Sequence, residues 1–140
     1  MNIYLDIDGV LLANDRFAAH GADEFLLYVL QNYPDTTYWL STHCHGNENR
    51  TIEAIGSFLK PETMELVKTI KPTNWGLAKT EAIDFNQPFL WFDDDLYKEE
   101  QQALEQHDCM PNFVEVDLRK DENALQKLIK NFSKPVQPKV

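Results

Sequence analysis

The feature that most constrains the fold is a regular alternation of short apolar segments with longer segments of helical character. Apolar, β-branched and aromatic residues predict strands at 3–6, 37–41, 89–92 and 113–116. Helical spacing and helix start and stop signals predict helices at 22–32, 49–58, 76–85, 97–106 and 122–132. A further strand is expected at 66–70, although a helix that begins at Pro61 fits that segment nearly as well. Because strands that alternate with helices form parallel sheets, we expect an α/β fold, a three-layer α/β/α sandwich with five central strands.

Length and composition predict a single domain. The chain has 140 residues, of which 43% are hydrophobic and 11% aromatic, enough for a real core. We place the domain at 1–132 and expect the tail 133–140, which carries two prolines, to fray. The apolar runs of the chain are too short to span a bilayer, so no membrane association is expected. Two cysteines do not make a disulfide framework and no basic leader precedes the first strand, which favours a cytoplasmic protein.

The charge balance bears on partners. A formal net charge of −10 argues against a broad nucleic-acid surface, which would need a basic face. Nucleic acid therefore remains a candidate only as a substrate end, and a protein partner remains open.

Two carboxylates follow the first predicted strand directly. Asp6 and Asp8 are separated by one residue and followed by Gly9. Since side chains alternate along a strand, both would point to the same side, and this like-charge pair is costly unless a cation or a shared proton relieves it. An Asp-rich turn is one interpretation. The others are a metal site, an acid/base pair, or a nucleophile beside an acid.

Polar residues also follow the other predicted strands. Ser41 and Thr42 come after the second strand, and three aspartates, 93–95, come after the segment 89–92. Ligands of parallel sheets bind beyond the carboxyl ends of the strands, so these groups are expected to share one edge. Several carboxylates in one cleft need a cation, and such oxygen ligands favour Mg²⁺. A hydroxyl and the Lys79 ammonium would suit a phosphoryl group, although each alone fits a structural or surface role.

The order of these motifs resembles the haloacid dehalogenase superfamily. The motifs lie between residues 3 and 95: Asp6-x-Asp8-Gly9-Val10, Ser41 at a strand end, Lys79 at the start of a later helix, and Asp93-Asp94 after an apolar strand. The resemblance implies a Mg²⁺-dependent phosphatase, a phosphoric monoester hydrolase that works through an aspartyl-phosphate. Segments 39–42 and 91–95 are particularly similar to small capless members, some of which accompany nucleic-acid repair enzymes.

The same resemblance implies a role for each residue. Asp6 would be the nucleophile and a metal ligand, and Asp8 the general acid/base with its backbone carbonyl on Mg²⁺. Ser41, Thr42 and Lys79 would hold the phosphoryl oxygens. Asp94 or Asp93 would complete the metal site, with Asp94 favoured because the second acid of such pairs usually holds the ion in similar proteins.

The spacing of the motifs leaves no room for a cap domain. Segment 9–40 fits a loop and one helix, and segment 42–78 fits a helix and a strand. The site should therefore be open to a phosphate on a polymer end or a protein, or closed by a partner. Two other classes stay open: a receiver-like signalling module, and a catalytically weak module that uses the fold for protein interaction.

Histidines, cysteines and tryptophans add two minor hypotheses. A zinc site would combine 43–45 (His-Cys-His) with His107 and Cys109, but its spacing matches no standard zinc motif. His43 and His45 otherwise fit the rim of the phosphate site or plain loop positions. Trp75, in a loop before Lys79, is the one tryptophan expected to be placed for stacking on a ligand.

Overall fold

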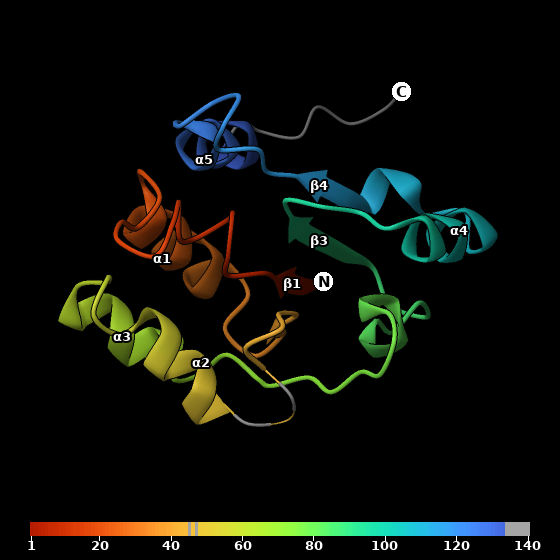
Figure 1. The fold of residues 1–140 in the computed structure, drawn as a ribbon, viewed down its shortest axis with the longest axis horizontal. Coiled ribbons are helices and arrows are strands. Elements are labelled where there is room, and N and C mark those ends of the chain that lie inside the picture. The colour runs from red at the N-terminus through yellow and green to blue at the C-terminus, as the bar shows by residue number, and fades with distance from the viewer. Residues whose placement is uncertain (45, 47, 134–140) are drawn as a thin grey trace.

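A parallel sheet of four strands lies at the centre of the fold in the computed structural model, which describes residues 1–44, 46 and 48–133 (Figure 1). The order across the sheet is β2-β1-β3-β4. The strands are β1 (Asn2–Leu5), β2 (Thr37–Trp39), β3 (Phe89–Asp93) and β4 (Phe113–Glu115). All three pairings are parallel, so the predicted α/β class with a parallel sheet is confirmed.

The helices connect these strands. In chain order they are α1 (Ala22–Asn32), α2 (Glu48–Ile55), α3 (Pro61–Val67), α4 (Lys98–Gln106) and α5 (Ala124–Ser133). Two short 3₁₀ helices are η1 (Lys79–Ala82) and η2 (Met110–Asn112). The helix expected at 76–85 is therefore only a 3₁₀ turn. The predicted frayed tail lies, apart from Ser133, outside the described residues.

The strand expected at 66–70 does not form, so the described sheet has four strands rather than five. Helix α3 occupies Pro61–Val67 instead, starting at a proline, a residue suited to the first helical position. Asp23 of α1 stabilises this start, because its Oδ1 accepts the Lys60 N–H at 2.9 Å and the Thr63 hydroxyl at 2.6 Å. What remains of the fifth strand is a single parallel bridge between Tyr38 and Lys71.

Both faces of the sheet are buried. Ile3 and Leu5 of β1 and Phe92 of β3 belong to the larger apolar cluster, which includes residues of α1 and α5. Tyr4 and Trp91, on alternate positions of the same strands, belong to a second cluster with residues of α4. In Figure 1, α1, α2 and α3 lie to one side of the sheet and α4 to the other. This double burial explains why the strands are apolar at nearly every position.

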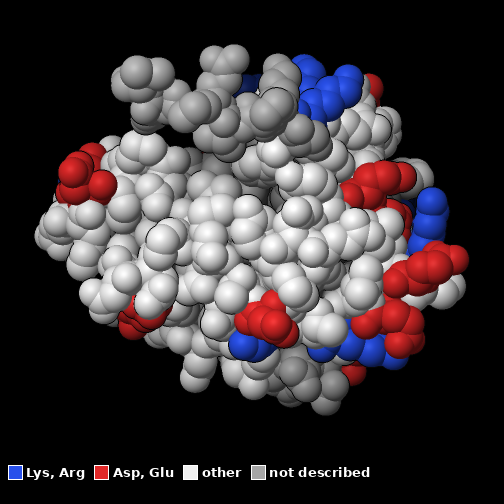
Figure 2. Space-filling model, turned by 180° about the vertical axis from the view of Figure 1, so that it is seen from behind, with Lys and Arg blue, Asp and Glu red and all other residues white. Residues whose placement is uncertain are grey.

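The surface carries its charges unevenly. On the face shown in Figure 2, acidic and basic side chains lie mainly toward the margin, and the central area is largely uncharged. Within the described part of the chain, no helix is both long and apolar enough to cross a membrane.

Candidate active site

The acids predicted from the sequence meet where the strand order switches. The chain passes from β1 outward to β2 and then returns to the other side of β1 as β3, so β1 and β3 are neighbours. Asp6 directly follows β1, and its N–H donates to the carbonyl of Phe92 at 3.0 Å. Asp93 is the last residue of β3. The two carboxylates are therefore fixed at the carboxyl edge of the two central strands, where ligands bind in such sheets.

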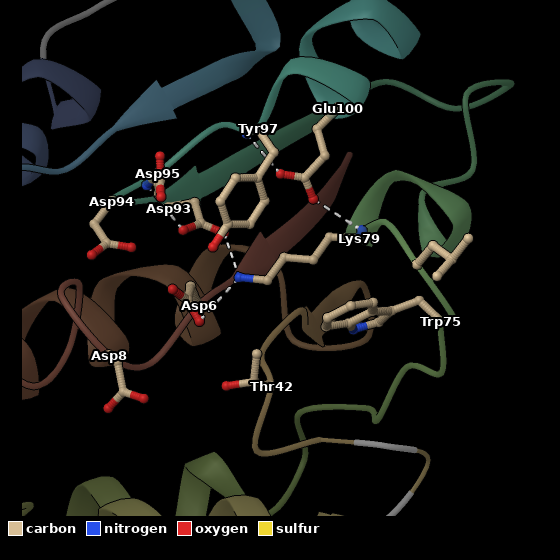
Figure 3. A pocket seen from close by; sticks show the side chains of 11 residues that line it. Asp6, Asp8, Thr42, Trp75, Lys79, Asp93, Asp94, Asp95, Tyr97 and Glu100 are labelled. Carbon is tan, nitrogen blue, oxygen red and sulfur yellow. Dashed lines mark hydrogen bonds and ion pairs between the residues drawn. The ribbon is translucent and has the colours of Figure 1, made fainter.

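Lys79 lies between these two carboxylates (Figure 3). Its Nζ donates to Asp93 Oδ2 at 2.7 Å and forms an ion pair with Asp6 Oδ1 at 3.4 Å. All three side chains are buried. A buried ion pair is costly to disrupt, so this contact holds the ammonium group at a defined place beside the nucleophile candidate.

A carboxylate that the sequence did not single out positions Lys79. Glu100 of α4 is buried, and its Oε2 accepts the backbone N–H of Lys79 at 3.0 Å. Its Oε1 accepts the N–H of Tyr97 at 3.0 Å. Glu100 thus joins the start of η1 to the start of α4. A glutamate in the first turn of a helix is a known capping signal, but its second bond to a distant segment leaves no sequence pattern.

Burial and proximity shift the pKa values of the cluster. Burial raises the pKa of Asp6 above its usual range, against the opposing charge of Lys79. Burial, followed by the negative charge of Asp6, raises the pKa of Asp93 to about 6. Burial lowers the pKa of Lys79, but the carboxylates of Asp6 and Asp93 outweigh that effect and raise it overall. Lys79 therefore stays charged at neutral pH. Its single positive charge does not offset the burial of the carboxylates, so the pKa values of Asp6 and Asp93 stay raised.

Asp94 is the more exposed acid of the pair and lies over Gly9. Partial burial of its carboxyl group, and then the neighbouring Asp93, raise the pKa of Asp94 to about 6. Gly9 has a φ of 79°, and a Cβ at that position would overlap the Asp94 carboxylate. The backbone conformation of this position therefore favours glycine, and any larger residue would also displace the Asp94 side chain.

Three of these acids are close enough to share an ion. Each of Asp6, Asp93 and Asp94 offers a carboxylate oxygen, and these oxygens lie within 4.8 Å of one another. Among the described residues, no other group of three or more His, Cys, Asp and Glu side chains meets this condition. The three carboxylates and Lys79 carry a net charge of −2 when all are ionised, which a divalent cation would cancel. An all-oxygen donor set fits Mg²⁺, so the residues present fit the predicted metal.

Asp8 lines the same pocket but is not part of this cluster. Its side chain is 63% exposed, and its Oδ2 lies 2.7 Å from His43 Nε2. Figure 3 shows its carboxylate apart from those of Asp6 and Asp93. The arrangement leaves Asp8 accessible to a group that enters the pocket from solvent.

Of the two hydroxyl residues predicted to hold phosphate, only Thr42 lines the pocket. Ser41 is fully buried, and its Oγ accepts the His43 N–H at 3.1 Å. Its position after β2 agrees with the expected place of the motif, but its hydroxyl organises the loop that follows.

The pocket above the acids has a volume of about 240 Å³. Carboxylates and Lys79 form one part of its wall, and Trp75, Leu77 and Tyr97 form another. Leu77 is fully exposed and Tyr97 is 63% exposed. Large apolar side chains at the mouth of a polar pocket suit the non-phosphate part of a small ligand. Of the three, the sequence pointed only to Trp75.

The hypothetical zinc ligands are not brought together in the described part of the chain. His107 stacks on Phe85 with ring centroids 3.9 Å apart, and Cys109 Sγ donates to the carbonyl of Leu104. His45 lies outside the described residues. Both cysteines are free and buried.

Comparison with protein-family models, with curated proteins and with solved structures found no match for this chain. What the site can do must therefore be argued from its own residues.

Proposed function

We propose that the protein is a Mg²⁺-dependent phosphatase of the haloacid dehalogenase type, which hydrolyses phosphoric monoesters through an aspartyl-phosphate on Asp6. The observation that carries this proposal is the meeting of Asp6, Asp93 and Asp94 with the Lys79 ammonium at the carboxyl edge of β1 and β3. The order of the motifs along the chain supports it independently.

The residues divide into two groups by the chemistry they offer. Asp6, Asp93 and Asp94 would hold Mg²⁺, with a further contribution from the Asp8 carbonyl that the resemblance implies. When bound, Mg²⁺ would offset the charge of the phosphate dianion, so that a carboxylate can approach it. Lys79 and Thr42 would bind the remaining phosphoryl oxygens, because one offers an ammonium group and the other a hydroxyl group at the pocket wall.

The reaction would proceed in two steps. First, a carboxylate oxygen of Asp6 attacks phosphorus while the bond from phosphorus to the leaving oxygen breaks. The carboxylic acid of Asp8 gives its proton to that oxygen, which releases an alcohol and leaves Asp8 ionised. Second, Asp8 takes a proton from a water molecule whose oxygen attacks the phosphorus. The bond to Asp6 then breaks, inorganic phosphate leaves, and Asp8 is protonated again.

The substrate would be a small phosphoric monoester or a phosphate at the end of a larger molecule. Segment 9–40 contains one α-helix, α1. The described residues of segment 42–78 contain two, α2 and α3, and form no cap domain. An open pocket of about 240 Å³ accepts a phosphate and a small neighbouring group, while the rest of a longer substrate stays in solvent.

The test is phosphate release from a panel of phosphorylated metabolites, nucleic-acid ends and phosphopeptides, with an aryl phosphate as a general substrate. We expect activity that needs Mg²⁺ and is lost in Asp6→Asn. Asp35→Asn is the matched control, because Asp35 is exposed and precedes β2 at the opposite edge of the sheet. Unchanged activity in Asp6→Asn would refute the proposal, and phosphate retained on another aspartate would favour a receiver-like module.

A further inference from the structure

The contact between His43 and Asp8 is not explained by the roles described so far. His43 Nε2 lies 2.7 Å from Asp8 Oδ2, although the two residues are 35 positions apart in the chain. We propose that His43 is a positioning residue that holds the Asp8 carboxyl group in place for its proton transfers. This inference rests on the proposed phosphatase function and adds a residue to that same site.

Asp8 needs such a partner because of where it lies. Its side chain is 63% exposed, and an exposed aspartate samples several rotamers. A general acid works only when its proton is within hydrogen-bond reach of the leaving oxygen. Only the rotamer that points at the leaving oxygen is productive, so holding Asp8 in that rotamer raises the rate without changing the chemical steps.

His43 is itself well anchored. Its backbone N–H donates to Ser41 Oγ at 3.1 Å, and the N–H of the next residue, Cys44, donates to the Ser41 carbonyl at 3.1 Å. Ser41 and Cys44 are both fully buried. The imidazole, whose side chain is 37% exposed, therefore extends from a fixed turn after β2 to the loop after β1. The buried Ser41 hydroxyl thus contributes to the site by fixing the backbone of His43.

The contact assigns separate tasks to the two oxygens of Asp8. In the tautomer that carries its proton on Nε2, His43 donates to Asp8 Oδ2, and this leaves Oδ1 to carry the transferred proton. In the first step the proton passes from Oδ1 to the leaving oxygen. In the second step Oδ1 takes a proton from the attacking water. The histidine keeps its own proton throughout and touches neither substrate nor phosphorus.

The decisive test compares leaving groups, because a weakened general acid matters most when the leaving oxygen is strongly basic. In His43→Ala we expect kcat on an alkyl phosphate to fall by about 10- to 100-fold, and kcat on p-nitrophenyl phosphate by less than about 3-fold. KM should change little for either ester. His43→Gln can place an amide N–H near the same point and should recover part of the loss. His20→Ala, at an exposed histidine outside this pocket, should match the wild type.

A second readout needs neither activity nor metal. In the Mg²⁺-free protein at one fixed pH, the imidazole nitrogen chemical shifts of His43 should report a protonated, hydrogen-bonded Nε2. Asp8→Asn should move this signal, while the signal of His20 stays in place.

The outcomes separate the two proposals. An inactive wild type would overturn the phosphatase function itself. An active wild type with an equal loss on both esters in His43→Ala would overturn only the positioning role, and so would a His43 signal that ignores Asp8→Asn.

Discussion

Replacing Lys79 by methionine removes the ammonium group between Asp6 and Asp93 but keeps a side chain of similar length. In the Mg²⁺-free protein the two buried carboxylates then face each other without the cation that pairs with both. Breaking a buried ion pair by removing one partner costs about 3–5 kcal/mol. Because Lys79 is only 8% exposed, solvent screening reduces this cost little. For a domain of this size the loss corresponds to a decrease in Tm of about 10–17 °C.

The assay is urea unfolding and thermal melting in a chelator and again in excess Mg²⁺. We expect Mg²⁺ to stabilise Lys79→Met more than the wild type, because the ion offsets the charge that the variant leaves uncompensated. Lys68→Met is the control, since Lys68 pairs with Glu65 on the surface and its side chain is 55% exposed. That change should cost less than about 1 kcal/mol. The reasoning fails if Lys79→Met costs no more than Lys68→Met in the chelator.

Three further predictions concern stability and metal binding. Gly9→Ala should lower the free energy of unfolding by about 1–2 kcal/mol, because an alanine is strained at a φ of 79°. The same change should weaken Mg²⁺ binding measured by calorimetry, because the new Cβ displaces the Asp94 carboxylate. In the chelator, the wild type should lose about 2–3 kcal/mol as pH rises from about 4 to above 6, since the folded state holds a proton on Asp93, whose pKa is about 6, that the unfolded state has already released. Urea unfolding across that range checks this, and Asp93→Asn should reduce the slope, while the partly exposed Asp94, whose pKa is also about 6, keeps a smaller part of it; a wild type that gains stability there would contradict the sign. Asp23→Ala removes the acceptor for the buried Thr63 hydroxyl and should cost about 1–2 kcal/mol in thermal or urea unfolding, whereas an unchanged midpoint would show that α3 does not depend on it.

The sheet was predictable because its strands carry a local signal. β1 and β3 are apolar on both faces, and α1 was placed at its observed bounds, 22–32, because its apolar stripe is followed by a proline. Segment 66–70 was not decided locally, since its residues suit a strand and a helix alike. Two long-range hydrogen bonds of Asp23 stabilise the start of α3 and so favour the helix, and such bonds leave no periodic pattern in the sequence.

The helix expected at 76–85 shows the same limit. Only the turn at Lys79–Ala82 forms, because beyond it the N–H of Asp84 donates to the Tyr4 hydroxyl and that of Asn86 to Asp84 Oδ1, both at 3.0 Å, rather than to helix carbonyls. Side-chain carboxylates accept the N–H groups that precede and begin the turn. Glu81 accepts those of Leu77 and Ala78, and Glu100 accepts that of Lys79. Local apolar spacing favoured a longer helix, but the contact of Asp84 with Tyr4, 80 residues away in the chain, leaves no signal in that spacing.

In the site, the acids could be predicted because each ends or follows a central strand. The different surroundings of Asp93 and Asp94 could not be predicted. They depend on Lys79, which binds the Asp93 carboxylate, and on the space over Gly9, which the Asp94 carboxylate occupies. The contact between His43 and Asp8 was also invisible, since two loops must first be brought together by the sheet.

The single bridge at Lys71 has a consequence for how the protein behaves at high concentration. An unpaired outer strand offers its N–H and carbonyl groups to strands of other molecules, and so invites aggregation. Along β2, Lys71 already accepts the N–H of Trp39 and donates to the carbonyl of Thr37. The next residue, Pro72, has no N–H and cannot extend the ladder. One residue thus blocks the edge of a three-residue strand, and the proline keeps the blocking segment from becoming a new edge itself.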